Sequence, residues 1–162
     1  MKHTSVRPVD HVEQVMDTYG NMLFRLCLLT LGNASDAEDA VQETLIRYFQ
    51  KAPLFENTEH EKAWLIKVAT NKCKDMLRFY KRHSCVNIEE INEYTQDFTS
   101  YGIIDALMGT PEKFRTVLLL YYVEGYSIEE IAKIIGKTSS AVKMRLLKGR
   151  RLLREIYGKE YQ

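Results

Sequence analysis

The chain has 162 residues, of which 45% are hydrophobic and 28% charged, a composition that excludes fibrous and disordered classes and fits one ordinary domain or two small ones. Its longest apolar run, residues 117–123, is far shorter than the ~20 residues that span a bilayer, and the first ten residues lack the apolar core of a signal peptide. Three cysteines without CxxC spacing indicate reduced thiols. We therefore expect a cytoplasmic protein with no membrane insertion of its own.

Charge is balanced in total but segregated along the chain. The formal net charge is +1, yet residues 62–82 and residues 137–154 each hold seven Lys or Arg, with Asp75 the only acidic residue in the two segments together. Residues 83–112 between them contain no Lys or Arg and carry several carboxylates. Two basic segments around an acidic one predict two separate contacts with a polyanion.

The periodicity of apolar residues is helical throughout, which predicts an all-α fold. We expect capping boxes to start helices at Ser35, Thr58 and Ser127, and Thr110-Pro111 to start another with proline in its first position. Residues 86–102 lack a sustained apolar stripe, so we interpret them as a flexible acidic linker between two small helical domains, 1–85 and 103–162. The helices are expected near 9–31, 35–51, 59–82, 103–109, 111–123, 127–135 and 139–157.

The expected helix 35–51 has a polar, mostly acidic face opposite its apolar stripe. Ile46 lies in the middle of this face, either as a stray exposed residue or as the centre of a protein-docking surface. The candidate docking residues are Asp39, Gln42, Glu43 and Ile46.

The expected helix 59–82 carries a cationic face opposite an apolar stripe. Cations beside an amide and an aromatic ring suit single-stranded nucleic acid, whose bases stack and whose phosphates need neutralising. We interpret the cationic face as functional, although Trp64 taken alone is more simply a buried aromatic residue under a solvated surface. The candidate residues are Trp64, Lys67, Asn71, Lys74 and Arg78.

Residues 127–157 read as a helix-turn-helix, with small Ala132 at the crossing, Gly136 in the turn and Val142 as an apolar plug. The outer face of the second helix combines cations, a hydroxyl and apolar atoms, as a duplex-reading helix needs, although a solvated basic helix of a bundle is the alternative. The residues of this face are Ser140, Lys143, Met144, Leu147, Lys148 and Arg151. Scattered histidines and the lack of a phosphate loop or nucleophile motif predict no metal, no cofactor and no catalysis.

Several motifs in this order resemble the extracytoplasmic-function (ECF) sigma factors of the sigma-70 family. Segments 35–44 and 63–71 are similar to sigma region 2, and segments 110–118, 126–132 and 142–146 are similar to sigma region 4. The resemblance implies a promoter-specificity subunit of bacterial RNA polymerase that initiates transcription of a stress or envelope-response regulon. It implies no enzyme activity of the chain itself.

The resemblance also implies roles for the faces described above. The face around Ile46 would dock on the β′ clamp helices of core polymerase, and the second domain would contact the β flap. The loop 55–61 and the face with Trp64, Asn71 and Arg78 would capture the melted −10 strand. The face with Lys143, Met144, Leu147 and Lys148 would read the −35 element, and the acidic linker would lie in the RNA path. An anti-sigma factor, often membrane-anchored in this family, is a further expected partner.

Two other classes of function stay open at the level of sequence. A stand-alone helix-turn-helix regulator would bind an operator by itself, usually as a dimer on two half-sites. A helical adaptor would bind protein only and would leave the basic helix 139–157 without a purpose.

Overall fold

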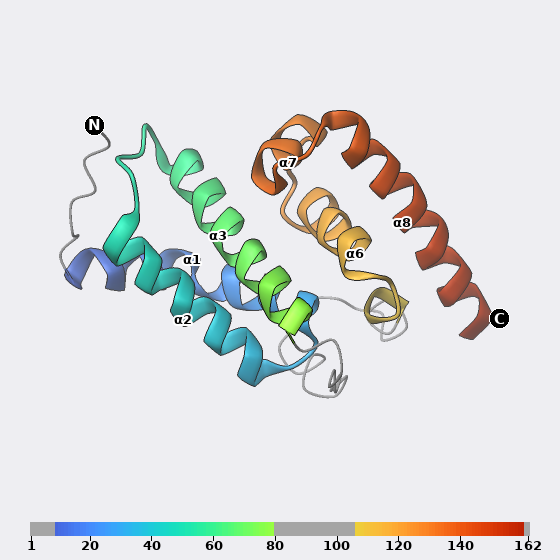
Figure 1. Cartoon of the computed structure of the whole chain (residues 1–162), viewed down its shortest axis with the longest axis horizontal. Coiled ribbons are helices and arrows are strands. Elements are labelled where there is room, and N and C mark those ends of the chain that lie inside the picture. The colour runs from blue at the N-terminus through green and yellow to red at the C-terminus, as the bar shows by residue number, and fades with distance from the viewer. Residues whose placement is uncertain (1–8, 80–105, 161–162) are drawn as a thin grey trace. The chain divides into compact units, whose positions relative to one another are not determined.

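The computed structural model describes residues 9–79 and 106–160, and every regular element in these ranges is helical, as the sequence predicts (Figure 1). The chain divides into two units, Met1–Ser84 and Cys85–Gln162, which are described separately below. Two helical units agree with the predicted fold class. The segment 86–102, interpreted above as a linker, lies outside the described residues.

The first unit consists of α1 (Val9–Leu31), α2 (Ala34–Lys51) and α3 (Thr58–Phe79). Each of these helices packs on the other two, and Figure 1 shows α2 and α3 side by side. The apolar stripes meet in a core in which each fully buried large side chain contributes about 1.5–3 kcal/mol. The largest buried side chains of this core are Leu23, Leu28, Leu29, Tyr48, Leu65 and Ile66.

Two of the predicted helix starts are wrong by one or two residues. The N-cap of α2 is Asn33 and not Ser35, because the side chain of Asn33 accepts a 2.8 Å hydrogen bond from the amide of Asp36. At α3, the side chain of Asn57 accepts a 2.8 Å bond from the amide of His60, so Thr58 is already helical. Asparagine is as good an N-cap as serine or threonine, and here it stands earlier in the chain.

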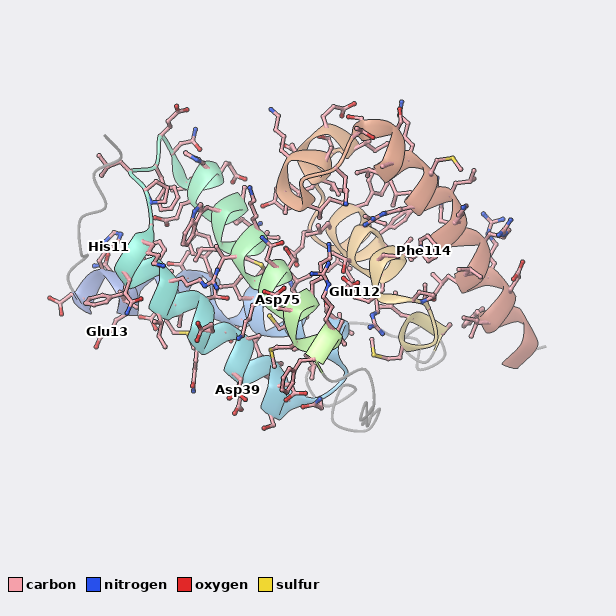
Figure 2. All side chains as sticks on the ribbon, in the orientation of Figure 1. His11, Glu13, Asp39, Asp75, Glu112 and Phe114 are labelled. Carbon is pink, nitrogen blue, oxygen red and sulfur yellow. The ribbon has the colours of Figure 1, made fainter. Side chains whose placement is uncertain are left out.

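The second unit contains a helical segment at 106–108, then α6 (Glu112–Leu118), η1 (Leu119–Val123), α7 (Ile128–Ile135) and α8 (Ser139–Glu160). Its core forms where α6 and α7 pack against α8. Figure 2 shows Phe114 on the side of α6 that faces α8. The largest fully buried side chains of this unit are Val117, Leu120, Ile131, Val142 and Leu146.

The predicted single helix 111–123 is α6 continued by one π-helical turn. The amide of Glu124 donates to the carbonyl of Leu119, five residues back, and Pro111 stands at the N-cap rather than in the first helical position. Wider turns of this kind occur mostly as single turns and often at functional sites.

The helix-turn-helix forms for the reasons that the sequence suggests. Ser127 and Glu130 make the predicted capping box, with bonds of 3.2 and 2.8 Å. Gly136 ends α7 at φ 69°, a left-handed conformation that glycine adopts without steric cost. Val142, in the first turn of α8, is fully buried, and α7 packs on α8. The outer face of α8 is therefore fixed relative to the core of its unit.

Candidate nucleic-acid and protein interfaces

The outer face of α2 carries the four predicted docking residues. Ile46 is 48% exposed, Asp39 and Gln42 are exposed, and Glu43 is half-buried. Figure 2 shows Asp39 extending from α2 toward solvent. The structure brings all four residues to one groove of about 280 Å³, whose opposite wall is formed by Lys72 and Met76 of α3.

A second face, on α3, carries the predicted cationic residues. Lys67, Asn71 and Arg78 are exposed and Lys74 is half-buried. The apolar stripe expected on the opposite side of the helix is buried, and its residues are Leu65, Ala69, Cys73 and Met76. The helical repeat of 3.6 residues puts positions 67, 71, 74 and 78 on one side of the helix. Residues 80–82, the last of the expected helix, lie outside the described residues.

Trp64 is half-buried at the edge of this cationic face. Its ring meets the ring of Tyr48 edge-on at 6.0 Å between centroids and that of Phe55 at 5.8 Å. Phe55 in turn stacks on Tyr48 at 6.1 Å. Edge-on and stacked aromatic pairs of this kind add about 0.5–1.5 kcal/mol beyond their buried area. The indole therefore anchors the loop 52–57 and keeps part of its surface accessible.

Tyr48 links the three helices of the first unit through hydrogen bonds. Its hydroxyl donates to Glu61 Oε2 at 2.8 Å and lies 2.9 Å from Nε2 of His11, which Figure 2 shows beside α2. Since the hydroxyl proton points to Glu61, Nε2 of His11 is assigned as the donor of the second bond. Nearby, burial and the carboxylates of Glu61 and Glu59 raise the pKa of Tyr19, so its hydroxyl stays protonated. This network fixes the start of α3 against α1 and α2.

The loop before α3 has its own polar contacts. His60 Nδ1 accepts from the amide of Glu56 at 3.2 Å, and the His60 ring meets Phe55 edge-on at 5.2 Å. Leu54 is 76% exposed at the tip. The loop is thus held at its base and presents an apolar side chain to solvent.

The outer face of α8 is the third surface. Met144 is 51% and Leu147 59% exposed, although both are large apolar side chains. They lie among exposed polar and cationic side chains, which are Ser140, Lys143, Lys148 and Arg151. Arg151 makes an ion pair with Glu155 at 3.9 Å, and an exposed pair of this kind is worth at most ~1 kcal/mol. Arg151 therefore stays available to a ligand.

Three residues adjoin these surfaces in positions that the sequence analysis did not assign to them. Lys72 and Met76 line the groove beside α2. Lys72 comes five residues after Lys67, and five residues turn a helix by about 140°, so Lys72 points away from the cationic face that Lys67 belongs to. Arg150 donates a 3.0 Å bond to the hydroxyl of exposed Tyr122 in η1. No local sequence signal could have found a contact across 28 residues.

Within the described ranges, no group of three or more His, Cys, Asp or Glu side chains could hold a metal ion. Cys27 and Cys73 are buried in the core of the first unit. None of the helices from α1 to α8 in the described part of the chain has the length and apolarity that crossing a membrane requires.

Comparison with known families assigns both units. Residues 15–83 match the family model of Sigma-70 region 2, and residues 103–161 match that of Sigma-70, region 4. The chain belongs to the sigma-70 family of RNA polymerase sigma factors, in its ECF group. Sigma factors are transcription initiation factors and not enzymes, which agrees with the expected lack of catalysis.

Curated relatives support the same assignment over most of their length. The ECF RNA polymerase sigma factor SigL of Mycobacterium tuberculosis is 32% identical over 148 residues, covering 85% of this chain and 84% of the relative. The ECF RNA polymerase sigma factor SigW of Bacillus subtilis is 28% identical over 165 residues, covering 90% of this chain and 88% of the relative. These matches support a sigma factor over a stand-alone regulator or an adaptor.

Solved structures share the fold. CnrH, solved in complex with the cytosolic domain of CnrY, aligns with a TM-score of 0.70 at 21% identity over 94% of this chain and 90% of its own. The sigma factor RpoE of Bartonella quintana, solved in complex with the anti-sigma factor NepR, aligns with a TM-score of 0.68 at 21% identity, over 91% of this chain and 97% of its own.

Proposed function

We propose that the three surfaces divide the work of a sigma factor among them. The face of α2 with Asp39, Gln42, Glu43 and Ile46 binds core RNA polymerase. An exposed isoleucine surrounded by acidic and amide groups fits the pattern of a protein interface, which has an apolar centre and a polar rim. Family membership favours the polymerase clamp as its partner.

The cationic face of α3 and the loop before it bind the unpaired −10 strand. Lys67, Lys74 and Arg78 neutralise backbone phosphates, while Asn71 offers donor and acceptor groups to a base edge. The accessible side of Trp64 stands beside them as a stacking surface. Binding the unpaired strand better than the duplex shifts the equilibrium toward the open promoter.

The outer face of α8 reads the −35 element in duplex DNA. Lys143, Lys148 and Arg151 contact phosphates or base acceptors, Ser140 offers a hydroxyl, and Met144 and Leu147 contact thymine methyl groups. The observation that carries this assignment is the exposure of two large apolar side chains, Met144 and Leu147, on an otherwise cationic face. Such side chains favour a partner that offers both negative charge and methyl groups.

The domain limits follow the same division, with 1–85 as the polymerase and −10 domain, 86–102 as a linker in the RNA path and 103–162 as the −35 and β-flap domain. The chain acts in the cytoplasm, where bacterial RNA polymerase works. Two structural neighbours were solved with anti-sigma partners, which supports regulation of this chain by a protein of that kind.

A double substitution on α2 tests the docking surface. Ile46→Glu with Gln42→Ala should weaken binding to core polymerase at least tenfold in a pull-down with purified components, because it charges the apolar centre. Arg47→Ala, on the same helix and also exposed but turned about 100° from Ile46, is the matched control. Unchanged core binding by the double variant would place the docking surface elsewhere.

Asn71→Ala tests the −10 surface separately. Duplex binding by the assembled holoenzyme should persist while promoter opening falls, which permanganate reactivity of the −10 thymines reports. Equal opening by the variant and the parent would remove Asn71 from this role.

A further inference from the structure

The groove between α2 and α3 has a wall that does not belong to the predicted docking surface. Asp39, Gln42, Glu43 and Ile46 line one side, and Lys72 and Met76 of α3 line the other. From sequence, Lys72 counts among the seven cations of the basic segment 62–82. In the fold it is turned about 140° away from Lys67, toward the acidic face of α2.

The charged groups around this groove do not pair with one another. In the described residues of the first unit, the carboxylates of Asp39 and Glu43 and the ammonium of Lys72 make no side-chain hydrogen bond or ion pair. Their charge is not used to hold α2 against α3. Ile46, which is 48% exposed, supplies most of the apolar surface of the groove, and Met76, which is buried at 8% exposed, adds a small part of it.

The lining of the groove argues against a small-molecule ligand. Its volume of about 280 Å³ is at the lower end of the roughly 300–1,000 Å³ of pockets that enclose such ligands, and charged and amide side chains outnumber the apolar ones that usually line them. It suits an inserted side chain of a protein, with the ionic groups left at the rim where they set orientation.

We propose that Lys72 is a polymerase-contacting residue and not a DNA-contacting one. This inference rests on the docking role proposed for α2 and extends that surface across the groove onto α3. The occupant is a segment of core polymerase that inserts an apolar side chain between Ile46 and Met76. That segment carries a carboxylate opposite Lys72 and a cation opposite Asp39 and Glu43. Two carboxylates facing one ammonium fix which way round the segment binds, because the reversed arrangement places like charges together.

A charge reversal at Lys72 tests the inference, with Lys67→Glu as the matched control on the same helix. Both full-length variants are first checked for unchanged thermal unfolding. The affinity for purified core RNA polymerase is then measured without DNA. The capture of a −10 single strand is measured with core polymerase at saturating concentration.

Lys72→Glu should lower core affinity about tenfold and leave strand capture by the saturated holoenzyme unchanged. Lys67→Glu should keep the parental affinity for core polymerase and should weaken strand capture by the saturated holoenzyme. The inference is overturned if Lys72→Glu keeps full core affinity, or if it impairs strand capture at saturating core.

The variant Ile46→Glu distinguishes an error in the role of Lys72 from an error in the position of the whole docking surface. If Ile46→Glu loses core affinity while Lys72→Glu does not, the docking surface ends at α2 and only the extension is wrong. If neither variant loses core affinity, the docking surface itself has been misplaced.

Discussion

The buried hydroxyl of Tyr48 donates a 2.8 Å hydrogen bond to Glu61 at the beginning of α3. This bond joins the end of α2 to the first turn of α3, across the loop that carries Phe55. The contact with His11 extends it to α1. One side chain thereby connects the helix of the docking surface to the helix of the cationic face.

Tyr48→Phe should destabilise the first unit by about 1 kcal/mol, because it removes the bonds to two half-buried polar partners, His11 and Glu61, and keeps the ring in place. In a unit of this size each 1 kcal/mol lowers the melting temperature by roughly 4–8 °C. The only tryptophan, Trp64, touches the Tyr48 ring, so its fluorescence reports this unfolding directly. A melting temperature equal to that of the parent would show that the network is not stabilising.

The observed N-cap of α2, Asn33, can be compared directly with the expected one, Ser35. Asn33→Ala should cost about 1 kcal/mol, since the amide of Asp36 loses its acceptor, whereas Ser35→Ala should cost almost nothing. Trp64 fluorescence during urea unfolding measures both variants. If Ser35→Ala lowered the free energy of unfolding more than Asn33→Ala, the N-cap would be Ser35, as the sequence suggested.

Gly149 sets the distance between α6 and α8. A Cβ placed there would lie 3.2–3.3 Å from Leu118 and Phe114, while the same atom at Gly158 would meet nothing within 4 Å. Gly149→Leu should therefore cost about 1–3 kcal/mol through overpacking. Gly158→Leu is the matched control. Circular dichroism should show an earlier loss of helix for Gly149→Leu while the Trp64 fluorescence transition stays in place, and coincident melting of both variants would contradict this packing.

Salt dependence tests the cationic face of α8. In the holoenzyme, Lys143→Ala with Lys148→Ala should reduce the slope of log affinity against log salt by roughly 0.9 for each phosphate that the variant no longer neutralises. Lys113→Ala, a lysine of α6 that lies against the Phe114 ring, should leave the slope unchanged. A double variant with the parental slope would show that these lysines do not touch the DNA backbone.

Periodicity in the sequence predicts most of this fold, because each helix buries a single apolar stripe. Val142 and Leu146 are buried as expected, and Lys143 and Leu147, one position further on, are exposed. The same geometry places the four docking residues on one face of α2.

Contacts between helices could not be predicted in this way. The bond from Tyr48 to Glu61 and the groove position of Lys72 depend on how two helices pack, which one stripe does not specify. The caps at Asn33 and Asn57 were missed because several residues in a row can cap a helix and the sequence does not choose among them. The π-helical turn that starts at Leu119 leaves the apolar pattern intact and gave no signal.

The most direct test is transcription reconstituted from this chain and purified core RNA polymerase on candidate promoters, with mapping of the RNA 5′ ends. The parent should direct initiation at discrete start sites that core polymerase alone does not use. Ile46→Glu with Gln42→Ala should abolish these transcripts. Asn71→Ala should reduce them at the opening step, and Lys143→Ala with Lys148→Ala should reduce those that depend on a −35 element. Transcripts whose start sites are the same with and without the chain would contradict a role in promoter selection.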